Sequence, residues 1–252
     1  MTGAHHEVDR AEGRQGASDV NSILASERSD TRRVTLRDTV ADEIRRRVFT
    51  ARILPGQRVD QDGLASELGV SRVPVREALI TLHEEGLIEN IAHRGAFVAE
   101  LSREDVIDHY RLLGVVSGLA AERAAVAMTD ADRDALAGLL DEMERVFAAG
   151  VAADAERLNF RFHQRIHRLA RSRRLASVIR GLARAIPTEF YETHSDWPTK
   201  AHEDHVRIAG ALSAGDSDRA RQETEWHFAD GGARAVRHLE ELGFWGHGTT
   251  PA

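Results

Sequence analysis

The apolar residues of this 252-residue chain follow a helical period along most of its length, and they change to a β-type pattern only between residues 87 and 99. Two short runs carry that change, Leu87-Ile88-Glu89 and Ala96-Phe97-Val98-Ala99. Gly95 stands just before the second run and supplies the backbone freedom of a turn. The pattern therefore predicts one β-hairpin in an otherwise mainly α-helical protein.

Three short helices are predicted ahead of the hairpin. Apolar residues recur every four positions along the first helix, at Leu36, Val40, Ile44 and Val48. This helix ends before Pro55-Gly56, which dictates a turn. Asp60 and Ser71 are favoured N-caps for the second and third helices, and Gly86 ends the third. Three helices followed by a hairpin predict a winged helix-turn-helix.

The chain after Leu101 has a helical pattern throughout. We expect helices at about 102–127, 130–148, 151–171, 173–194, 199–214 and 216–242. Capping boxes begin two of them, at Ser102 and Thr129. The expected organisation is a disordered arm over 1–30, a winged helix-turn-helix over 31–101, an all-α antiparallel bundle over 102–245, and a loose tail over 246–252.

Composition excludes several classes of protein. Hydrophobic residues make up 42% of the chain and charged residues 30%, and there is no cysteine for disulfides or thiolate metal sites. No apolar run is long enough to span a bilayer, and the first thirty residues lack a secretory core, so we expect a cytoplasmic protein with no membrane partner. The net charge is −7, but residues 32–58 carry eight arginines against three acids.

The N-terminal residues of the third helix are candidates for reading DNA, because the second helix of a helix-turn-helix enters the major groove. The candidate DNA-binding residues are Ser71, Arg72, Pro74, Val75 and Arg76, with Arg94 and Gly95 in the wing. Arg72 and Arg76 share one helix face, and the arginine fork fits guanine edges and phosphates. The alternative interpretation is a solvated face on a generic helical bundle.

The same region resembles the GntR family of bacterial regulators. The resemblance runs from about residue 36 to 99 and rests on Leu54-Pro55-Gly56, the run from Leu64 to Leu79 that contains Ser71-Arg72-Val73-Pro74-Val75-Arg76-Glu77-Ala78-Leu79, then Glu85-Gly86-Leu87-Ile88 and Gly95-Ala96-Phe97-Val98. It implies that Arg72 and Arg76 recognise double-stranded DNA, with Arg94 and Gly95 in the wing.

The C-terminal half is similar to the FadR-type, or FCD, ligand-binding domain. The similarity rests on Asn159-Phe160-Arg161-Phe162-His163, the run His205-Val206-Arg207-Ile208-Ala209-Gly210-Ala211-Leu212, Gly215-Asp216 and His227. FCD domains are antiparallel helical bundles that dimerise, and many hold a divalent metal through an Asp and three histidines. The resemblance implies a metal site at Asn159, His163, His205 and His227, with zinc expected and nickel or manganese as alternatives.

The spacing of these residues is compatible with a metal site, but a second interpretation stays open. Asn159 and His163 lie four residues apart on one helix face, and imidazoles with one oxygen are suitable zinc ligands. Inward histidines can also be hydrogen-bonded core residues. The chain has thirteen histidines, and His167 and His202 form rival helical pairs with His163 and His205.

Two departures from the FCD pattern bear on the effector. Asn159 stands where an Asp is usual, so the oxygen brings no charge. Leu113 and Ser117 stand where an Arg and a Glu of an R-x-x-L-E-G pattern would help to hold an acidic effector. With three neutral imidazoles and an uncharged amide, the metal would attract an anion that coordinates it directly.

The leading expectation is a homodimeric repressor that binds an inverted-repeat operator and responds to a small organic acid at a metal centre. Two other regulators are possible: a metal-dependent one without an organic effector, and a constitutive DNA-binding dimer. A metal-dependent enzyme is the alternative from a different class, but no carboxylate obviously pairs with the histidines as a general base. The expected answer is that the protein is not an enzyme.

Overall fold

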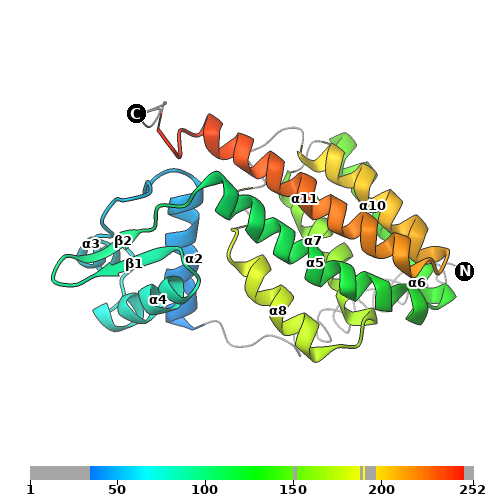
Figure 1. Cartoon of the computed structure of the whole chain (residues 1–252), viewed down its shortest axis with the longest axis horizontal. Coiled ribbons are helices and arrows are strands. Elements are labelled where there is room, and N and C mark those ends of the chain that lie inside the picture. The colour runs from blue at the N-terminus through cyan, green and yellow to red at the C-terminus, as the bar shows by residue number, and fades with distance from the viewer. Residues whose placement is uncertain (1–34, 150–151, 188–189, 191–196, 247–252) are drawn as a thin grey trace, which may run out of the picture.

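The computed structural model describes residues 35–149, 152–187, 190 and 197–246. The N-terminal elements are α2 (Leu36–Phe49), α3 (Gln61–Glu67), α4 (Arg72–Glu84), β1 (Ile88–Ile91) and β2 (Gly95–Val98). They gather at one end of the molecule, and the helices that follow form the other end (Figure 1). The expected mainly α fold class, with a winged helix-turn-helix and a helical domain, is confirmed. The expected disordered arm and all of the expected loose tail except Gly246 lie outside the described residues.

Side-chain caps set the starts of the N-terminal helices. Thr35 and Asp38 form a capping box on α2, in which each side chain accepts a hydrogen bond from the other residue's backbone N–H. Asp60 caps α3 as predicted, with its Oδ1 3.0 Å from the N–H of Gly63. Ser71 occupies the N-cap position of α4, but its side chain makes no capping hydrogen bond.

The two strands pair in antiparallel register, with Ile88 opposite Val98 and Ile91 opposite Gly95. Gly95 has a φ of 105°, which side chains rarely adopt. A Cβ atom there would also lie 3.2 Å from Nε of Arg58, which reaches the wing from the strand-like segment before α3. The wing therefore requires glycine at position 95 for its backbone angle, and a larger residue would also displace the Arg58 side chain slightly.

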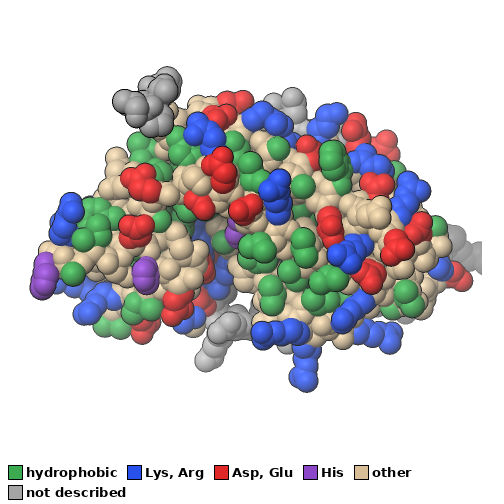
Figure 2. Space-filling model, viewed as in Figure 1, with side chains coloured by type: hydrophobic (Ala, Val, Ile, Leu, Met, Phe, Trp, Pro, Cys, Tyr) green, Lys and Arg blue, Asp and Glu red, His purple; other side chains and the backbone are tan. Residues whose placement is uncertain are grey.

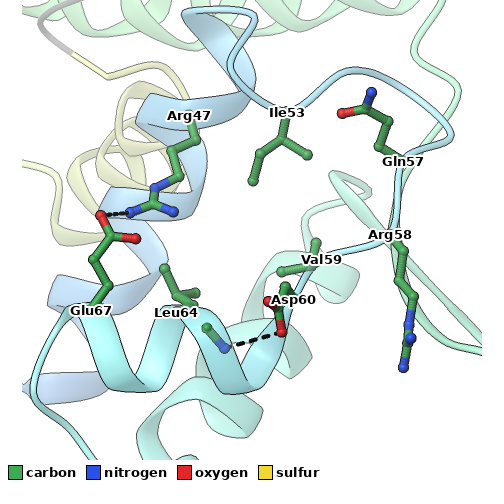
Figure 3. Close-up of a pocket in the computed structure, with 9 residues that line it drawn as sticks. Arg47, Ile53, Gln57, Arg58, Val59, Asp60, Leu64 and Glu67 are labelled. Carbon is green, nitrogen blue, oxygen red and sulfur yellow. Dashed lines mark hydrogen bonds and ion pairs between the residues drawn. The ribbon is translucent and has the colours of Figure 1, made fainter.

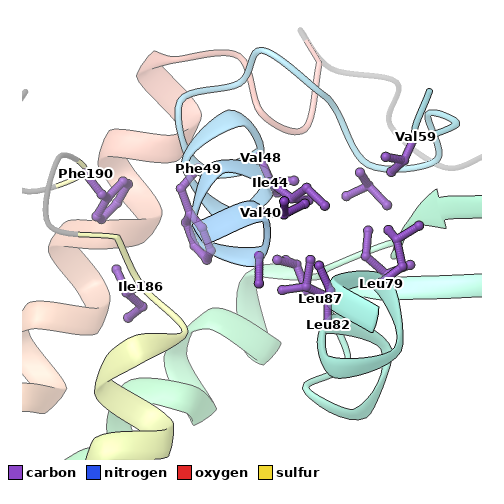
Figure 4. Close-up of a cluster of buried hydrophobic side chains, with 14 of the residues drawn as sticks. Val40, Ile44, Val48, Phe49, Val59, Leu79, Leu82, Leu87, Ile186 and Phe190 are labelled. Atoms are coloured by element: carbon purple, nitrogen blue, oxygen red, sulfur yellow. The ribbon is translucent and has the colours of Figure 1, made fainter. Parts of the chain in front are cut away.

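Helix α2 is the centre of the N-terminal core. Val40, Ile44 and Val48 are fully buried on the face predicted from their spacing, whereas Leu36 is 62% exposed, so the buried face begins at Val40. Leu79, Leu82 and Leu87 close this core from the side of α4 (Figure 4). On the other side of α2, the ring of Phe49 meets the ring of Phe190, with centroids 5.7 Å apart.

The helical domain consists of α5 (Arg103–Ala127), α6 (Asp130–Ala149), α7 (Ala152–Leu169), α8 (Arg173–Arg184), α10 (Trp197–Ser213) and α11 (Ser217–Glu241). The predicted capping boxes at Ser102 and Thr129 are present. Helices α5 and α11 run antiparallel and pack along their length (Figure 1). Glycines allow this close approach: a Cβ atom on Gly232 would lie 2.9 Å from Cβ of Tyr110.

The predicted helix over 173–194 is wrong in its extent. Helix α8 ends at Arg184, with Ala185 as its C-cap, and residues 185–187 are not helical. Pro187 gives the physical reason, because it lacks an N–H donor and disfavours helical geometry at the residue before it. The other expected helices of this domain begin and end within two residues of the observed ones.

Candidate DNA interface and metal centre

Helix α4 has a sharp division between its two faces. Over residues 72–80, five side chains of this helix are exposed and available for contact with a DNA groove: Arg72, Val73, Arg76, Glu77 and Ile80. Pro74 and Val75 are buried against the core, and Val75 is fully buried. The prediction that these two residues belong to the reading surface is therefore wrong for their side chains.

Val73, which the prediction left out, is exposed on the surface of α4, whereas Val75 is not. The side chain of Val73 is 63% exposed, and it lies beside Arg72 in the first turn of α4. Ile80 is 56% exposed two turns further along. An exposed aliphatic group on a recognition helix can pack on the methyl group of thymine. The sequence offered a signal for this, because Val73 does not share the inward face of Ala78, Leu79 and Leu82.

The other predicted residues lie around this helix. The Nε atom of Arg72 is 2.8 Å from Oδ1 of Asp62 on α3, and both side chains face solvent. Arg94 stands at the exposed tip of the hairpin, with its guanidinium 5.4 Å from the centre of the Phe97 ring. Ser71 is exposed at the start of α4.

Within the described part of the arginine-rich segment 32–58, four arginines pair with carboxylates of the protein: Arg37, Arg45, Arg46 and Arg47. Arg45 is buried, and its Nη2 lies 2.6 Å from Oε1 of Glu85 at the end of α4. Arg46 and Arg47 share the carboxylate of Glu43. These charges stabilise the domain, so the excess of arginine in this segment overstates the positive charge available to DNA.

An open pocket of about 290 Å³ lies between α2, α3 and the segment that joins them (Figure 3). Arg47 faces it, but this guanidinium is paired with Glu43 and with Glu67 across the pocket. Arg58 points away from the pocket (Figure 3), toward Gly95 of the wing. The pocket is therefore a part of the scaffold that positions α3 and the wing.

Three of the four predicted metal ligands come together inside the helical domain. His163 of α7, His205 of α10 and His227 of α11 each offer a ring nitrogen, and these atoms all lie within 4.8 Å of one another. The Nε2 atoms of His163 and His205 are 3.2 Å apart. Two nitrogens bound to one tetrahedral zinc ion are separated by about 3.3 Å, given zinc–nitrogen bonds of about 2.05 Å. The donor set and its spacing therefore fit a divalent ion.

The environment keeps these rings able to bind a metal. Burial lowers the pKa of His163 and of His205 well below the usual range, and the neighbouring His227 adds to the shift in both. Neutral imidazoles with a free lone pair are the form that metals require. Burial also lowers the pKa of His167 to about 4.

Asp204 is the functional residue that the sequence reasoning missed. Its Oδ2 atom lies 3.0 Å from Nδ1 of His227, so the carboxylate holds this ring on the side away from the other histidines. The sequence reasoning considered a carboxylate only as a general base, and Asp204 has a different place, hydrogen-bonded to a ring nitrogen of His227. Asp204 also pairs with Arg207, and Nη2 of Arg234 lies 3.6 Å from it. Its position directly before His205 gave no signal of this contact, because consecutive helical residues point about 100° apart and His227 lies on another helix.

Burial raises the pKa of Asp204, but the hydrogen bond to His227 and the surrounding positive charges outweigh this and lower it. The ionised carboxylate fixes which nitrogen of His227 carries a proton and leaves Nε2 available.

Asn159 lies one helical turn before His163 and is partly buried. Of the two rival histidines, His167 stacks on His163 with ring centroids 6.2 Å apart, and His202 packs on Phe147. Within the described ranges, neither belongs to the three-histidine group.

A recognition helix with exposed arginines, a wing beside it and a separate helical domain define a DNA-binding transcriptional regulator. The chain belongs to the GntR family: residues 36–98 match "Bacterial regulatory proteins, gntR family", and residues 108–230 match the "FCD domain". The family and its relatives are regulators and not enzymes. In the described ranges, no helix has the length and apolar character needed to cross a membrane.

Several regulators are similar to this chain. An uncharacterised HTH-type regulator of Mycobacterium tuberculosis is 30% identical over 161 residues, which are 64% of each chain. A regulator from the ttuE-ttuC' intergenic region of Agrobacterium vitis is 30% identical over 61% of this chain and 92% of its own. The probable D-xylose utilization operon repressor of Paenarthrobacter nicotinovorans is 28% identical over 78% of this chain and 87% of its own.

Two solved structures share the fold. The E. coli McbR/YncC structure has a TM-score of 0.62 at 22% identity, and the match covers 81% of this chain and 98% of that one. A GntR regulator from Rhodococcus has a TM-score of 0.57 at 24% identity and is covered over 97% of its length.

Proposed function

We propose that this protein is a homodimeric repressor that binds an inverted-repeat operator. A divalent metal and a carboxylate-bearing metabolite in the helical domain would control its affinity for this operator. The observation that carries the proposal is the convergence of His163, His205 and His227, with Asp204 behind His227. A hydrogen-bonded core histidine needs one partner, whereas here three imidazoles from three helices face a common point. That arrangement is what a divalent ion requires.

The three histidines would hold the ion, with Asn159 as a further oxygen from the same face of α7. The bound ion would supply positive charge and open coordination positions for an anion. Asp204 does not cancel this attraction, because Arg207 and Arg234 already share its charge. Leu113 is a buried apolar residue, so it cannot supply the positive charge of the arginine in the FCD pattern. A small organic acid that binds the ion directly is therefore the effector class that we expect.

Metal content tests the centre. The protein as purified should contain about one zinc, nickel or manganese ion per subunit, and His163→Ala, His205→Ala and His227→Ala should each lose it. His167→Ala is the matched control, because this ring stacks on His163 yet lies outside the three-histidine group. Equal metal content in all four variants, or no uptake by the native protein on titration, would restore the core-histidine interpretation.

The DNA-binding role of α4 and the wing rests on exposure and chemistry. Arg72 and Arg76 present guanidinium groups, Val73 presents an aliphatic group, and Arg94 stands at the hairpin tip. Arg72→Ala and Arg76→Ala should each cost about 1–3 kcal/mol of specific binding. Arg94→Ala should weaken binding to all sequences evenly. Unchanged specific affinity in both helix variants, measured by fluorescence anisotropy, would remove this assignment.

A second copy of the chain is the partner that we propose for the outer face of α5. Leu112 and Val115 are 57% and 44% exposed on adjacent turns, and Val178 on α8 is 38% exposed. Figure 2 shows hydrophobic side chains gathered over the middle of α5. A twofold dimer through this face would place two α4 helices for an inverted repeat. Light scattering should give a dimer, and Leu112→Glu should give a monomer that binds the operator weakly.

A further inference from the structure

We propose that Asp62 is a specificity-determining residue that positions Arg72 for base reading and discourages it from binding phosphate. Asp62 contributes no direct base contact in this proposal; it acts through the arginine. The inference rests on the proposed role of α4 as the reading helix.

The pairing of Asp62 with Arg72 joins the two helices of the helix-turn-helix. Asp62 lies in the first turn of α3, and the cap that Asp60 forms with Gly63 fixes this turn. Arg72 is the first residue of α4. The Nε atom of Arg72 lies 2.8 Å from Oδ1 of Asp62, within ion-pair distance. The carboxylate therefore approaches the guanidinium at its inner nitrogen.

The ion pair is open to solvent on the face that a DNA groove would cover. The side chains of Arg72 and Asp62 are 73% and 66% exposed. An exposed pair of this kind adds little to folding stability. The ion pair matters more when a bound duplex displaces the water around it, because the attraction between opposite charges strengthens in a less polar environment.

The ion pair at Nε favours one edge of the guanidinium for contact with a base. Arginine has a single N–H at Nε and two at each terminal nitrogen. When Asp62 occupies Nε, the terminal pair Nη1 and Nη2 remains, and these two donors match O6 and N7 of guanine. Asp62 thus biases the position of the fork before DNA arrives, which lowers the ordering cost of recognition.

The charge of Asp62 acts in a second way. A carboxylate beside Arg72 repels phosphate oxygens, so the pair fits a neutral base edge better than the DNA backbone. In the part of the chain that the structure describes, no ion pair joins Arg76 to a carboxylate. The two arginines of α4 therefore differ: Arg72 is restricted to base reading, whereas Arg76 is able to bind either a base or a phosphate.

The test measures discrimination rather than affinity alone. An operator is first selected from random duplexes with the full-length wild-type protein, and affinities are then measured by anisotropy for this operator, for its single-base-pair variants and for a scrambled duplex. Asp62→Ala should lower discrimination at one G·C pair of each half-site about tenfold. It should also bind the scrambled duplex more tightly, with a salt slope steeper by about one phosphate contact.

Four comparisons make the result decisive. Arg72→Ala should lose discrimination at the same base pair, and Asp62→Glu should retain most of it. Glu84→Ala removes an exposed acid at the far end of α4 and should change neither the discrimination nor the salt slope. Asp62→Asn should shift the salt slope as Asp62→Ala does, and it serves if the alanine variant is poorly folded. Wild-type discrimination in both neutral variants, with loss in Arg72→Ala, would overturn the role of Asp62. Wild-type discrimination in Arg72→Ala would instead overturn the reading role of Arg72 itself.

Discussion

Arg184, the last residue of α8, places its Nη2 atom 3.0 Å from Oδ2 of Asp42 on α2. Asp42 in turn pairs with the buried Arg45, whose guanidinium also binds Glu85 at the end of α4. Beside this network, Phe190 packs its ring on Phe49. The Nη1 atom of Arg184 also lies 3.5 Å from Oδ1 of Asp38 on α2, so the helical domain contacts α2 through charged pairs at Arg184 and through an aromatic contact. The pair with Asp42 leads on to the reading helix.

We expect this charged contact to transmit the state of the metal centre to DNA. Helix α8 packs on α5 and α7, and α7 carries His163. Arg184→Gln should leave metal uptake unchanged but reduce the ratio of operator affinities between metal-loaded and metal-free protein by about 1.4- to 5-fold, since exposed pairs contribute about 0.2–1 kcal/mol. Arg180→Gln, an exposed arginine one turn earlier on α8, is the control. An unchanged ratio in Arg184→Gln would show that the contact carries no signal.

A second prediction concerns the uncharged ligand position on α7. Asn159→Asp should tighten metal binding, because a carboxylate adds charge to the ligand set. The same change should weaken a carboxylate effector, because less positive charge remains to attract it. Calorimetric titration of metal, and then of candidate organic acids into the metal-loaded protein, checks both directions. An effector that binds equally to metal-loaded and metal-free protein would contradict the proposed coordination.

The sequence predicted the fold where one local signal dominated. The hairpin followed from a change of period and from Gly95, and the start of α3 followed from Asp60. It failed where contacts between distant segments decide: Arg45 belongs to the basic segment 32–58 but is buried against Glu85, and Asp204 reaches His227 only through the packing of α10 on α11. Residue type did not distinguish Val75 from Val73, whereas their spacing to Ala78 and Leu79 did, because Val75 shares the inward face of these residues.

The close contact between α5 and α11 gives a prediction on stability. Gly232→Ala should destabilise the protein by about 1–3 kcal/mol, because the new Cβ would lie 2.9 Å from Cβ of Tyr110 and the two helices would have to separate. Gly138→Ala on α6 is the matched control: nothing lies within 4 Å of its Cβ position, so helix propensity should stabilise the protein by about 0.5–1 kcal/mol. Urea unfolding measures both. Equal effects of the two substitutions would contradict the tight packing at Gly232.

His109 on α5 provides a prediction on pH. Its Nε2 lies 3.0 Å from the carbonyl oxygen of Leu182 on α8. Burial lowers its pKa, although the hydrogen bond to Leu182 and the negative charge of Glu85 oppose this shift. Below pH 6.5 the unfolded chain takes up a proton at this position that the folded protein resists. Acidification should therefore reduce the free energy of unfolding by up to about 1.4 kcal/mol per pH unit for this histidine, until the pH reaches its folded pKa.

His109→Gln isolates this contribution, because an amide can still donate to the Leu182 carbonyl but does not titrate. The free energy of unfolding in urea should be measured for both proteins at pH 7.5, 6.5 and 5.5. The other buried histidines titrate in both proteins, so only the difference between the two curves reports on His109. That difference should shift in favour of the variant as the pH falls below 6.5, by the uptake of about one proton. Parallel curves would show that His109 takes up its proton equally well in the folded and unfolded states.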